Sequence, residues 1–330
     1  MNSLKSIPFI LIIIPFFLYA QPKIVFEDYF IDKTTRIDYY HIGDARGEIV
    51  TIDQIYQYGI WAGSRKNLID EFNNGSYYAK IYDVKKGKLI FSKGFDSYFR
   101  EYKSTDAALS GKKKTYHETV LIPNPKSEFI FSLERRDAMN QLYTFYSDTI
   151  DPESIGIIRH EFLDPAVEVY KVKVNGNPHR KVDVVILAEG YTSADKEKFK
   201  SDTDRVTRAF FNQEPFKTNV SNFNIYAVFK ASAESGIDEP RAGIYKQTTL
   251  GVTFNSLNSE RYVLTEENKT MRDIAAHVPY DAIYIMVNHH RYGGGGIYNL
   301  FCTFTADNQF LEYLFVHEFG HSFAGLADEY

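Results

Sequence analysis

The stretch KVDVVILAEG, residues 181–190, decides the fold of the second half of this chain. Its residues from Val182 to Ala188 form an apolar run, broken only by Asp183, as in strands that are buried on both faces of a sheet. The next segment opens with capping residues and continues with an amphipathic pattern. It therefore predicts a helix over about residues 193–212.

Two later segments, FNIYAVFKA (residues 223–231) and DAIYIMVN (residues 281–288), predict further buried strands. A strand, a helix and then more strands are typical of an α/β domain, which we assign to residues 178–330. The boundary lies in VNGNPHRK, residues 174–181, where Asn-Gly and Asn-Pro pairs interrupt the pattern.

The preceding residues, 21–177, are rich in short segments of aromatic and β-branched residues separated by turn signals. The clearest segments are SYYAKIYDV (76–84), KLIFSKGF (88–95), SEFIFSL (127–133) and QLYTFYSD (141–148). Short strands at this spacing predict an antiparallel β-sandwich. The chain is thus expected to be a two-domain α+β protein. The sandwich is either a binding module or a support for the second domain.

The first residues, 1–20, resemble a secretory signal peptide. Lys5 precedes an apolar run from Ile7 to Tyr19, and Ala20 is the expected last residue removed. The run is shorter than the roughly 20 residues that span a bilayer, so we expect no membrane span in the mature protein. Export predicts a periplasmic, cell-surface or extracellular location, and the sequence leaves these three open.

Composition limits the classes of partner. The chain has 330 residues, of which 44% are hydrophobic, and its net charge of -5 is spread along its length. Without a basic patch, nucleic acid is not expected as a partner. Cys302 is the only cysteine, so an intramolecular disulfide is excluded. The oligomeric state is not indicated by the sequence.

The last fourteen residues, HEFGHSFAGLADEY (317–330), carry the chemistry. His317 and His321 are four residues apart on a predicted helix, so both imidazoles can reach one Zn²⁺ at about 2.0–2.1 Å. Glu318 is rotated by about 100° from His317, which places it beside the metal as a base for an activated water. The helix is expected to end at Gly325 in a left-handed cap.

Apolar residues cover the rest of this predicted helix. Phe310, Leu314, Phe315 and Phe319 are expected to fill its buried surface. A buried apolar helix rarely carries two histidines and a glutamate unless they have a function, because their polar atoms need partners. The pattern therefore favours a zinc hydrolase.

A catalytic zinc needs a third protein ligand. The chain continues from His321 through Gly325 to Asp328 and Glu329, which resembles the metzincin plan, in which a glycine turn precedes that ligand. The metzincin offset from the glycine points to Asp328. The glycine itself lies one residue later than usual, which leaves Glu329 as an alternative.

Further motifs support a family resemblance. VDVVILAEGYT (182–192), AFFNQEPF (209–216) and YGGGGIYN (292–299), together with the terminal motif, resemble the bacterial IgA-peptidase (igalysin-type) family of metzincin-like zinc metallopeptidases. The resemblance implies a β-sandwich before a metzincin-like catalytic domain, zinc bound by His317, His321 and Asp328, and Glu318 as general base.

The resemblance also implies a methionine-containing turn and a lower subdomain after the third ligand. Neither is in the sequence, so we expect the catalytic domain to be truncated at its C-terminus. The glycine run at residues 293–296 is expected at the sheet edge, where an extended substrate would pair, or else in a flexible loop. The family is named for immunoglobulin A, but the resemblance does not carry that substrate over to this chain.

Two functions follow from these observations. The leading hypothesis is a secreted zinc-dependent endopeptidase that acts on a protein or peptide substrate. The alternative is an exported binding or adhesion protein whose peptidase domain is inactive or truncated. A serine hydrolase is not supported, because the sequence contains no Gly-x-Ser-x-Gly motif.

Overall fold

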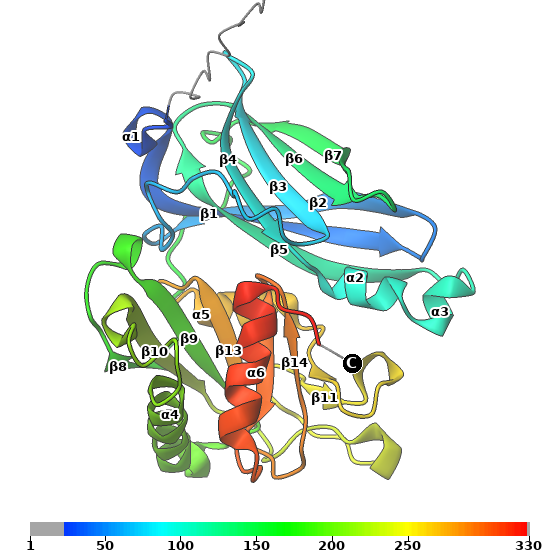
Figure 1. Ribbon diagram of the computed structural model, residues 1–330, viewed down its shortest axis with the longest axis vertical. Helices are drawn as coiled ribbons and strands as arrows, with labels where there is room; N and C mark the ends of the chain where they lie inside the picture. The colour runs from blue at the N-terminus through cyan, green and yellow to red at the C-terminus, as the bar shows by residue number, and fades with distance from the viewer. Residues whose placement is uncertain (1–22, 329–330) are drawn as a thin grey trace, which may run out of the picture.

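The structure is a computed structural model that describes residues 23–328 (Figure 1). The predicted signal peptide, residues 1–20, and the alternative ligand Glu329 lie outside the described residues. The N-terminal domain, as we use the term below, contains α1 (Phe26–Tyr29), β1 (Phe30–Gly43), β2 (Glu48–Tyr58), β3 (Tyr77–Asp83), β4 (Lys88–Phe95), α2 (Tyr98–Lys103), α3 (Asp106–Leu109), β5 (Lys114–Pro125), β6 (Phe129–Arg136) and β7 (Leu142–Ile150).

The C-terminal domain contains the remaining elements. These are β8 (Val167–Lys173), β9 (Val182–Glu189), α4 (Lys196–Phe211), β10 (Phe223–Lys230), β11 (Thr253–Phe254), β12 (Val263–Leu264), α5 (Asn268–Ala275), β13 (Ala282–Val287), β14 (Gly294–Ile297), β15 (Phe301–Thr305) and α6 (Leu311–Ala324). Among residues 23–328, no helix has the length and apolar character needed to cross a lipid bilayer.

Two antiparallel sheets form the N-terminal domain, with strand orders β2-β1-β5 and β4-β3-β6-β7. Ile37 and Ile122 from the first sheet and Ile81 and Phe131 from the second belong to one buried cluster. The two sheets therefore pack face to face around a shared core, as expected for a sandwich.

One mixed sheet organises the C-terminal domain, in the order β14-β15-β13-β9-β10-β8. The four inner strands are parallel, and the edge strands β14 and β8 are antiparallel to their neighbours. Side chains of the central strand β9 alternate between two cores: Val184 and Ile186 face α4 and α6, and Val185 and Leu187 face the opposite side. This arrangement confirms the prediction of a strand buried on both faces.

The helix predicted next to this strand is α4. It follows a short 3₁₀ turn in which Thr192 and Asp195 form a capping box. Phe199, Val206 and Phe210 are all buried against the sheet. The helix therefore begins and packs as its sequence predicts.

The boundary between the N-terminal and C-terminal sheets does not lie between residues 177 and 178, where the sequence predicts it. Strand β8, which precedes that boundary, pairs with β10 and forms one edge of the C-terminal sheet. Its sequence, VEVYKVK, alternates in the same way as the strands of the N-terminal domain. Hydropathy alone could not assign it, because both sheets have half-exposed edge strands.

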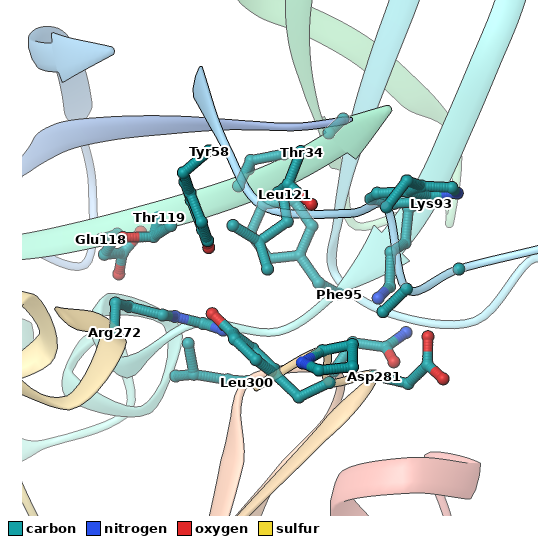
Figure 2. A pocket seen from close by; sticks show the side chains of 18 of the residues that line it. Thr34, Tyr58, Lys93, Phe95, Glu118, Thr119, Leu121, Arg272, Asp281 and Leu300 are labelled. Carbon is teal, nitrogen blue, oxygen red and sulfur yellow. The ribbon is translucent and has the colours of Figure 1, made fainter. Parts of the chain in front are cut away.

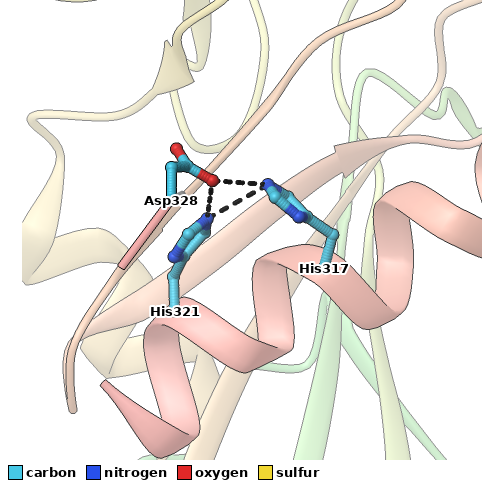
Figure 3. A group of neighbouring side chains, drawn as sticks. All are labelled: His317, His321 and Asp328. Atoms are coloured by element: carbon cyan, nitrogen blue, oxygen red, sulfur yellow. Dashed lines mark hydrogen bonds and ion pairs between the residues drawn. The ribbon is translucent and has the colours of Figure 1, made fainter. Parts of the chain in front are cut away.

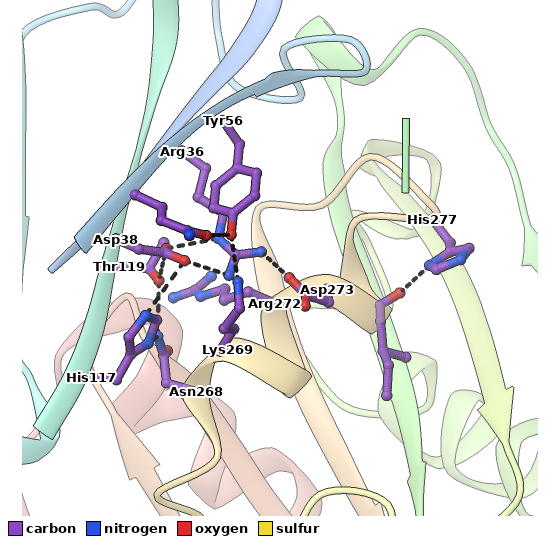
Figure 4. Close-up of polar contacts among 12 residues, drawn as sticks. Arg36, Asp38, Tyr56, His117, Thr119, Asn268, Lys269, Arg272, Asp273 and His277 are labelled. Carbon is purple, nitrogen blue, oxygen red and sulfur yellow. Dashed lines mark hydrogen bonds and ion pairs between the residues drawn. The ribbon is translucent and has the colours of Figure 1, made fainter. Parts of the chain in front are cut away.

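The two domains pack closely against each other. Tyr98, Phe99 and Tyr102 of α2 belong to the same buried cluster as Val185 and Leu187 of β9. Helix α5 adds polar contacts, which Figure 4 shows. Arg36 of β1 donates to Asp273 at 2.6 Å, and the Asn268 amide donates to the Thr119 hydroxyl at 2.8 Å. The N-terminal domain is therefore held in one orientation over the C-terminal sheet.

Candidate metal centre

Helix α6 positions the predicted metal-binding residues. Leu314, Phe315 and Phe319 are buried against the sheet, as expected, and the two histidines lie on another side of the helix. Phe310 differs from the prediction, because its side chain is 54% exposed. The reason is that α6 begins only at Leu311, so that Phe310 precedes the face that packs on the sheet.

A turn at Gly325 reverses the chain after α6. Gly325 has the left-handed conformation, with φ of 66°, and confirms the predicted end of the helix. Its N–H donates to the His321 carbonyl, and the Leu326 N–H donates to the Gly320 carbonyl, both at 3.1 Å. The bond from Gly325 to His321 is that of an αL-type cap. The cap directs the following residues back over the helix, so that Asp328 faces the histidines.

His317, His321 and Asp328 bring three ligand atoms together (Figure 3). The two Nε2 atoms are 3.1 Å apart, and Asp328 Oδ1 lies 3.3 Å from that of His317 and 3.2 Å from that of His321. Ligands at about 2.0–2.1 Å from a tetrahedral zinc are separated by about 3.3 Å. Two imidazole nitrogens and one carboxylate oxygen thus match zinc in both geometry and donor type.

Further contacts orient the two imidazoles. His321 Nδ1 lies 2.6 Å from the Leu326 carbonyl, which can only accept, so this nitrogen carries the proton and Nε2 keeps a free lone pair. His317 Nδ1 lies 3.3 Å from the Tyr313 hydroxyl. Burial, and next the neighbouring His321, lower the pKa of His317, whereas Asp328 raises it. The lowered pKa favours the neutral form of His317, and the hydrogen bond to Leu326 directs Nε2 of His321 toward Asp328, as a metal site requires.

The carboxylate of Glu318 lies beside this group, next to strand β14. The residue is buried, and the burial, followed by the negative charge of Asp328, raises its pKa to about 8. A Cβ atom on Gly294 would stand 2.7 Å from Glu318 Oε1, so the absence of a side chain there makes room for the carboxylate. A larger residue at position 294 would therefore displace the Glu318 carboxylate.

The glycine run lies at the edge of the sheet, as expected. Residues 294–297 form β14, and Tyr262 bridges to Gly294 on the outer side of this strand. Cβ atoms on Gly293 and Gly295 would contact Val263 and Leu264, on the face of the strand opposite to α6. The run is an ordered strand packed between two elements, which excludes the alternative of a flexible loop.

A cleft of about 220 Å³ adjoins the three ligand atoms. Strand β14, the segment of residues 259–264, α6 and Asp328 line it, together with Glu101 from α2 of the N-terminal domain. Arg261 is the basic residue of the lining. Sequence reasoning missed Glu101 and Arg261, because no local motif marks either residue. The N-terminal domain thus contributes a carboxylate to the cleft beside the candidate metal site.

The structure therefore brings the predicted ligands and the predicted base together, and their roles stay predictions.

Comparisons of the whole sequence with known protein families point to the same chemistry. A family model described as IgA Peptidase M64 matches residues 170–330, and a model described as Peptidase M64 N-terminus matches residues 25–147. A comparison with curated proteins found no match. The matched family is one of metallopeptidases, which generally depend on zinc. Because the two models together cover most of its length, the chain belongs to the IgA peptidase M64 family.

Proposed function

We propose that this chain is an exported zinc-dependent endopeptidase that hydrolyses peptide bonds of a protein or peptide substrate. The observation that carries the proposal is the triangle of ligand atoms from His317, His321 and Asp328, with edges of 3.1–3.3 Å. Membership of a metallopeptidase family supports the same activity independently. The substrate class follows from that activity.

The residues around the triangle have distinct roles in the proposed reaction. When bound there, zinc supplies a Lewis acid for the scissile carbonyl and lowers the pKa of a water to about 7. Glu318 is the general base, which takes a proton from the attacking water and delivers it to the leaving amine. Burial raises the pKa of this carboxyl group in the protein without metal. The positive charge of a bound zinc would favour the ionised form that a general base needs.

The position of β14 supports cleavage inside a chain. This strand is the last in its sheet and lies directly against α6. An extended peptide that adds to the part of this edge beyond the Tyr262 bridge would pass along the strand with both of its ends free. An enzyme that binds its substrate in this way does not need a chain terminus, which favours an endopeptidase.

A peptide-library digest analysed by mass spectrometry tests this function. We expect internal cleavages by zinc-loaded protein, their loss after chelation and their return when zinc is added. Specific binding of a protein or glycan by zinc-loaded protein that cleaves nothing in the library would instead favour an exported binding or adhesion protein.

Export rests on the N-terminal residues alone, which lie outside the described part of the chain. The run from Ile7 to Tyr19, preceded by Lys5, supports removal of residues 1–20. N-terminal sequencing of protein recovered from outside the cytoplasm is expected to begin at Gln21. Intact protein that starts at Met1 and stays in the cytoplasm would contradict export.

A further inference from the structure

A second pocket lies between the two domains and shares no lining residue with the metal cleft. It has a volume of about 60 Å³. Tyr58 and Lys93 reach into it from the N-terminal domain, and Arg272 and Asp281 lie on the opposite side, in the C-terminal domain (Figure 2). A group bound in this pocket would therefore touch both domains.

Arg272 is a buried cation without an acidic partner. Its side chain belongs to α5 and the residue is only 5% exposed. Its guanidinium makes one hydrogen bond, a long one of 3.5 Å from Nη1 to the Tyr280 hydroxyl, and Nε has no partner. Within residues 23–328, no carboxylate pairs with it. Buried arginines are almost always paired, so this guanidinium needs an acceptor that the described chain does not supply.

Tyr58 supplies a second unused donor. The residue is 4% exposed, and its hydroxyl has no hydrogen-bond partner within 3.5 Å in the described part of the chain. Tyr280 lies just beyond, close enough for a weak side-chain hydrogen bond, and Arg272 interacts with the hydroxyl electrostatically. Tyr58 Oη and Arg272 Nε are the two orphaned buried atoms among the described residues that line the pocket, and both can donate.

The acidic residues of the lining already have partners. Glu118 accepts from His41 Nδ1 at 2.9 Å and from the Phe99 N–H at 3.0 Å. Asp281 accepts from the Asp183 N–H at 2.9 Å, and Asp96 accepts from the Ser76 N–H at 2.8 Å. The groups of the pocket that lack partners are therefore donors, which need a ligand that accepts hydrogen bonds. A negatively charged ligand would also compensate the charge of Arg272.

We propose that this pocket binds a small oxyanion of the size of acetate or inorganic phosphate, held by Arg272 and Tyr58. The space corresponds to about four or five non-hydrogen atoms, because one water needs about 10–15 Å³ measured in this way. A guanidinium recognises carboxylate and phosphate oxygens in pairs. Because Tyr58 comes from β2 and Arg272 from α5, the bound oxyanion bridges the domains and stabilises their docking.

Calorimetric titration of the full chain with acetate and with phosphate tests this site, at an ionic strength held constant with sodium chloride. We expect one saturable site for at least one oxyanion and a melting temperature that rises with occupancy. Arg272→Met is expected to abolish the saturable response, and Tyr58→Phe to weaken affinity at least fivefold. Arg208→Met, which removes an exposed arginine of α4, is the control for loss of charge and should bind as the wild type does.

Each other result overturns the proposal. If neither oxyanion binds saturably, the pocket holds only water. If Arg272→Met binds as tightly as the wild type, the oxyanion occupies another site, such as the metal centre. If chloride competes fully at equal concentration, the pocket selects a halide. Should Arg272→Met fail to fold, Tyr58→Phe decides, because it removes one hydroxyl and keeps the charge; unchanged affinity in that variant contradicts the site.

Discussion

The position that a Cβ atom of Gly296 would occupy lies 2.6 Å from the backbone oxygen of Glu318. It also lies 2.8 Å from the Cβ atom of His321. Strand β14 and helix α6 thus approach as closely as their backbones allow, at the point where the helix carries the candidate site. A side chain at residue 296 would push the two apart.

We therefore expect Gly296→Ala to lower the free energy of unfolding by about 1–3 kcal/mol, as overpacking does. It should also lower kcat/KM by about tenfold, because the displaced helix carries Glu318 and both histidines. Urea unfolding and a peptidase assay measure these effects. Gly47→Ala is the matched control, since no atom lies within 4 Å of the added methyl group. Equal effects of the two substitutions would contradict the close approach.

The buried carboxyl group of Asp183 predicts a pH dependence of stability. Its Oδ1 accepts from the Asn224 amide at 2.8 Å, and its Oδ2 has no partner. Burial raises the pKa of Asp183 from 3.8 to about 7; the Asn224 hydrogen bond opposes this shift, and Asp281 adds to it. Because the folded state holds the proton more tightly, the associated stability is complete below about pH 4 and is lost as the pH rises to about 7.

Asp183→Asn removes this titration and keeps an acceptor for Asn224. Relative to the wild type, the variant should gain on the order of 4 kcal/mol between about pH 4 and pH 7, measured by urea unfolding at several pH values. Asp195→Asn is the control. A hydrogen bond from the Thr192 hydroxyl lowers the pKa of Asp195, so its contribution should be constant above about pH 5. If the free energy of unfolding of Asp183→Asn differs from that of the wild type by the same amount at every pH, Asp183 does not have the raised pKa.

The two acidic partners of Arg36 differ in burial, so their substitution should cost different amounts of stability. Its fully buried guanidinium binds Asp38 at 2.6 and 2.7 Å within β1, and Asp273, which is 37% exposed, at 2.6 Å across the domain interface. Asp38→Ala should cost about 3–5 kcal/mol, because it leaves a buried charge with less compensation. Asp273→Ala should cost about 1 kcal/mol or less. Urea unfolding of both variants measures the difference, and a larger loss for Asp273→Ala would reverse the interpretation.

Glu101 gives the cleft a negative side chain from the N-terminal domain. If the proposed peptidase function holds, peptides with Lys or Arg near the scissile bond should be preferred. Glu101→Gln should lower their kcat/KM by about tenfold and leave neutral peptides unchanged. Asp106→Asn removes an exposed charge of α3 and serves as the control. A uniform loss for basic and neutral peptides would show that Glu101 only supports the structure.

Local patterns predicted the elements whose formation depends on local physics. The two-sided strand β9 and the cap at Gly325 follow from hydropathy and backbone conformation, which are properties of the segments themselves. Strand β1 was not predicted, although it is the central strand of its sheet. Arg36 and Asp38 lie in its middle, and their charges look like those of an exposed segment until the fold pairs them.

Other features depend on how distant segments pack. Glu101 enters the cleft only because α2 is fixed against the C-terminal domain, and a short helix of one domain carries no signal of its neighbour. In the same way, the unpaired charge of Arg272 is visible only when its surroundings are known. The metal ligands could be proposed because two lie on one helical turn and the third follows a glycine cap.

The most direct test of the proposed mechanism measures zinc content and peptide hydrolysis in the same preparations of wild type, Glu318→Gln and Glu312→Gln. Glu312 is an exposed residue of the first turn of α6 and controls for loss of a carboxylate on that helix. We predict one zinc per chain in all three proteins, with hydrolysis by the wild type and Glu312→Gln only. Full hydrolysis by Glu318→Gln, or a wild type that binds no zinc, would contradict the mechanism.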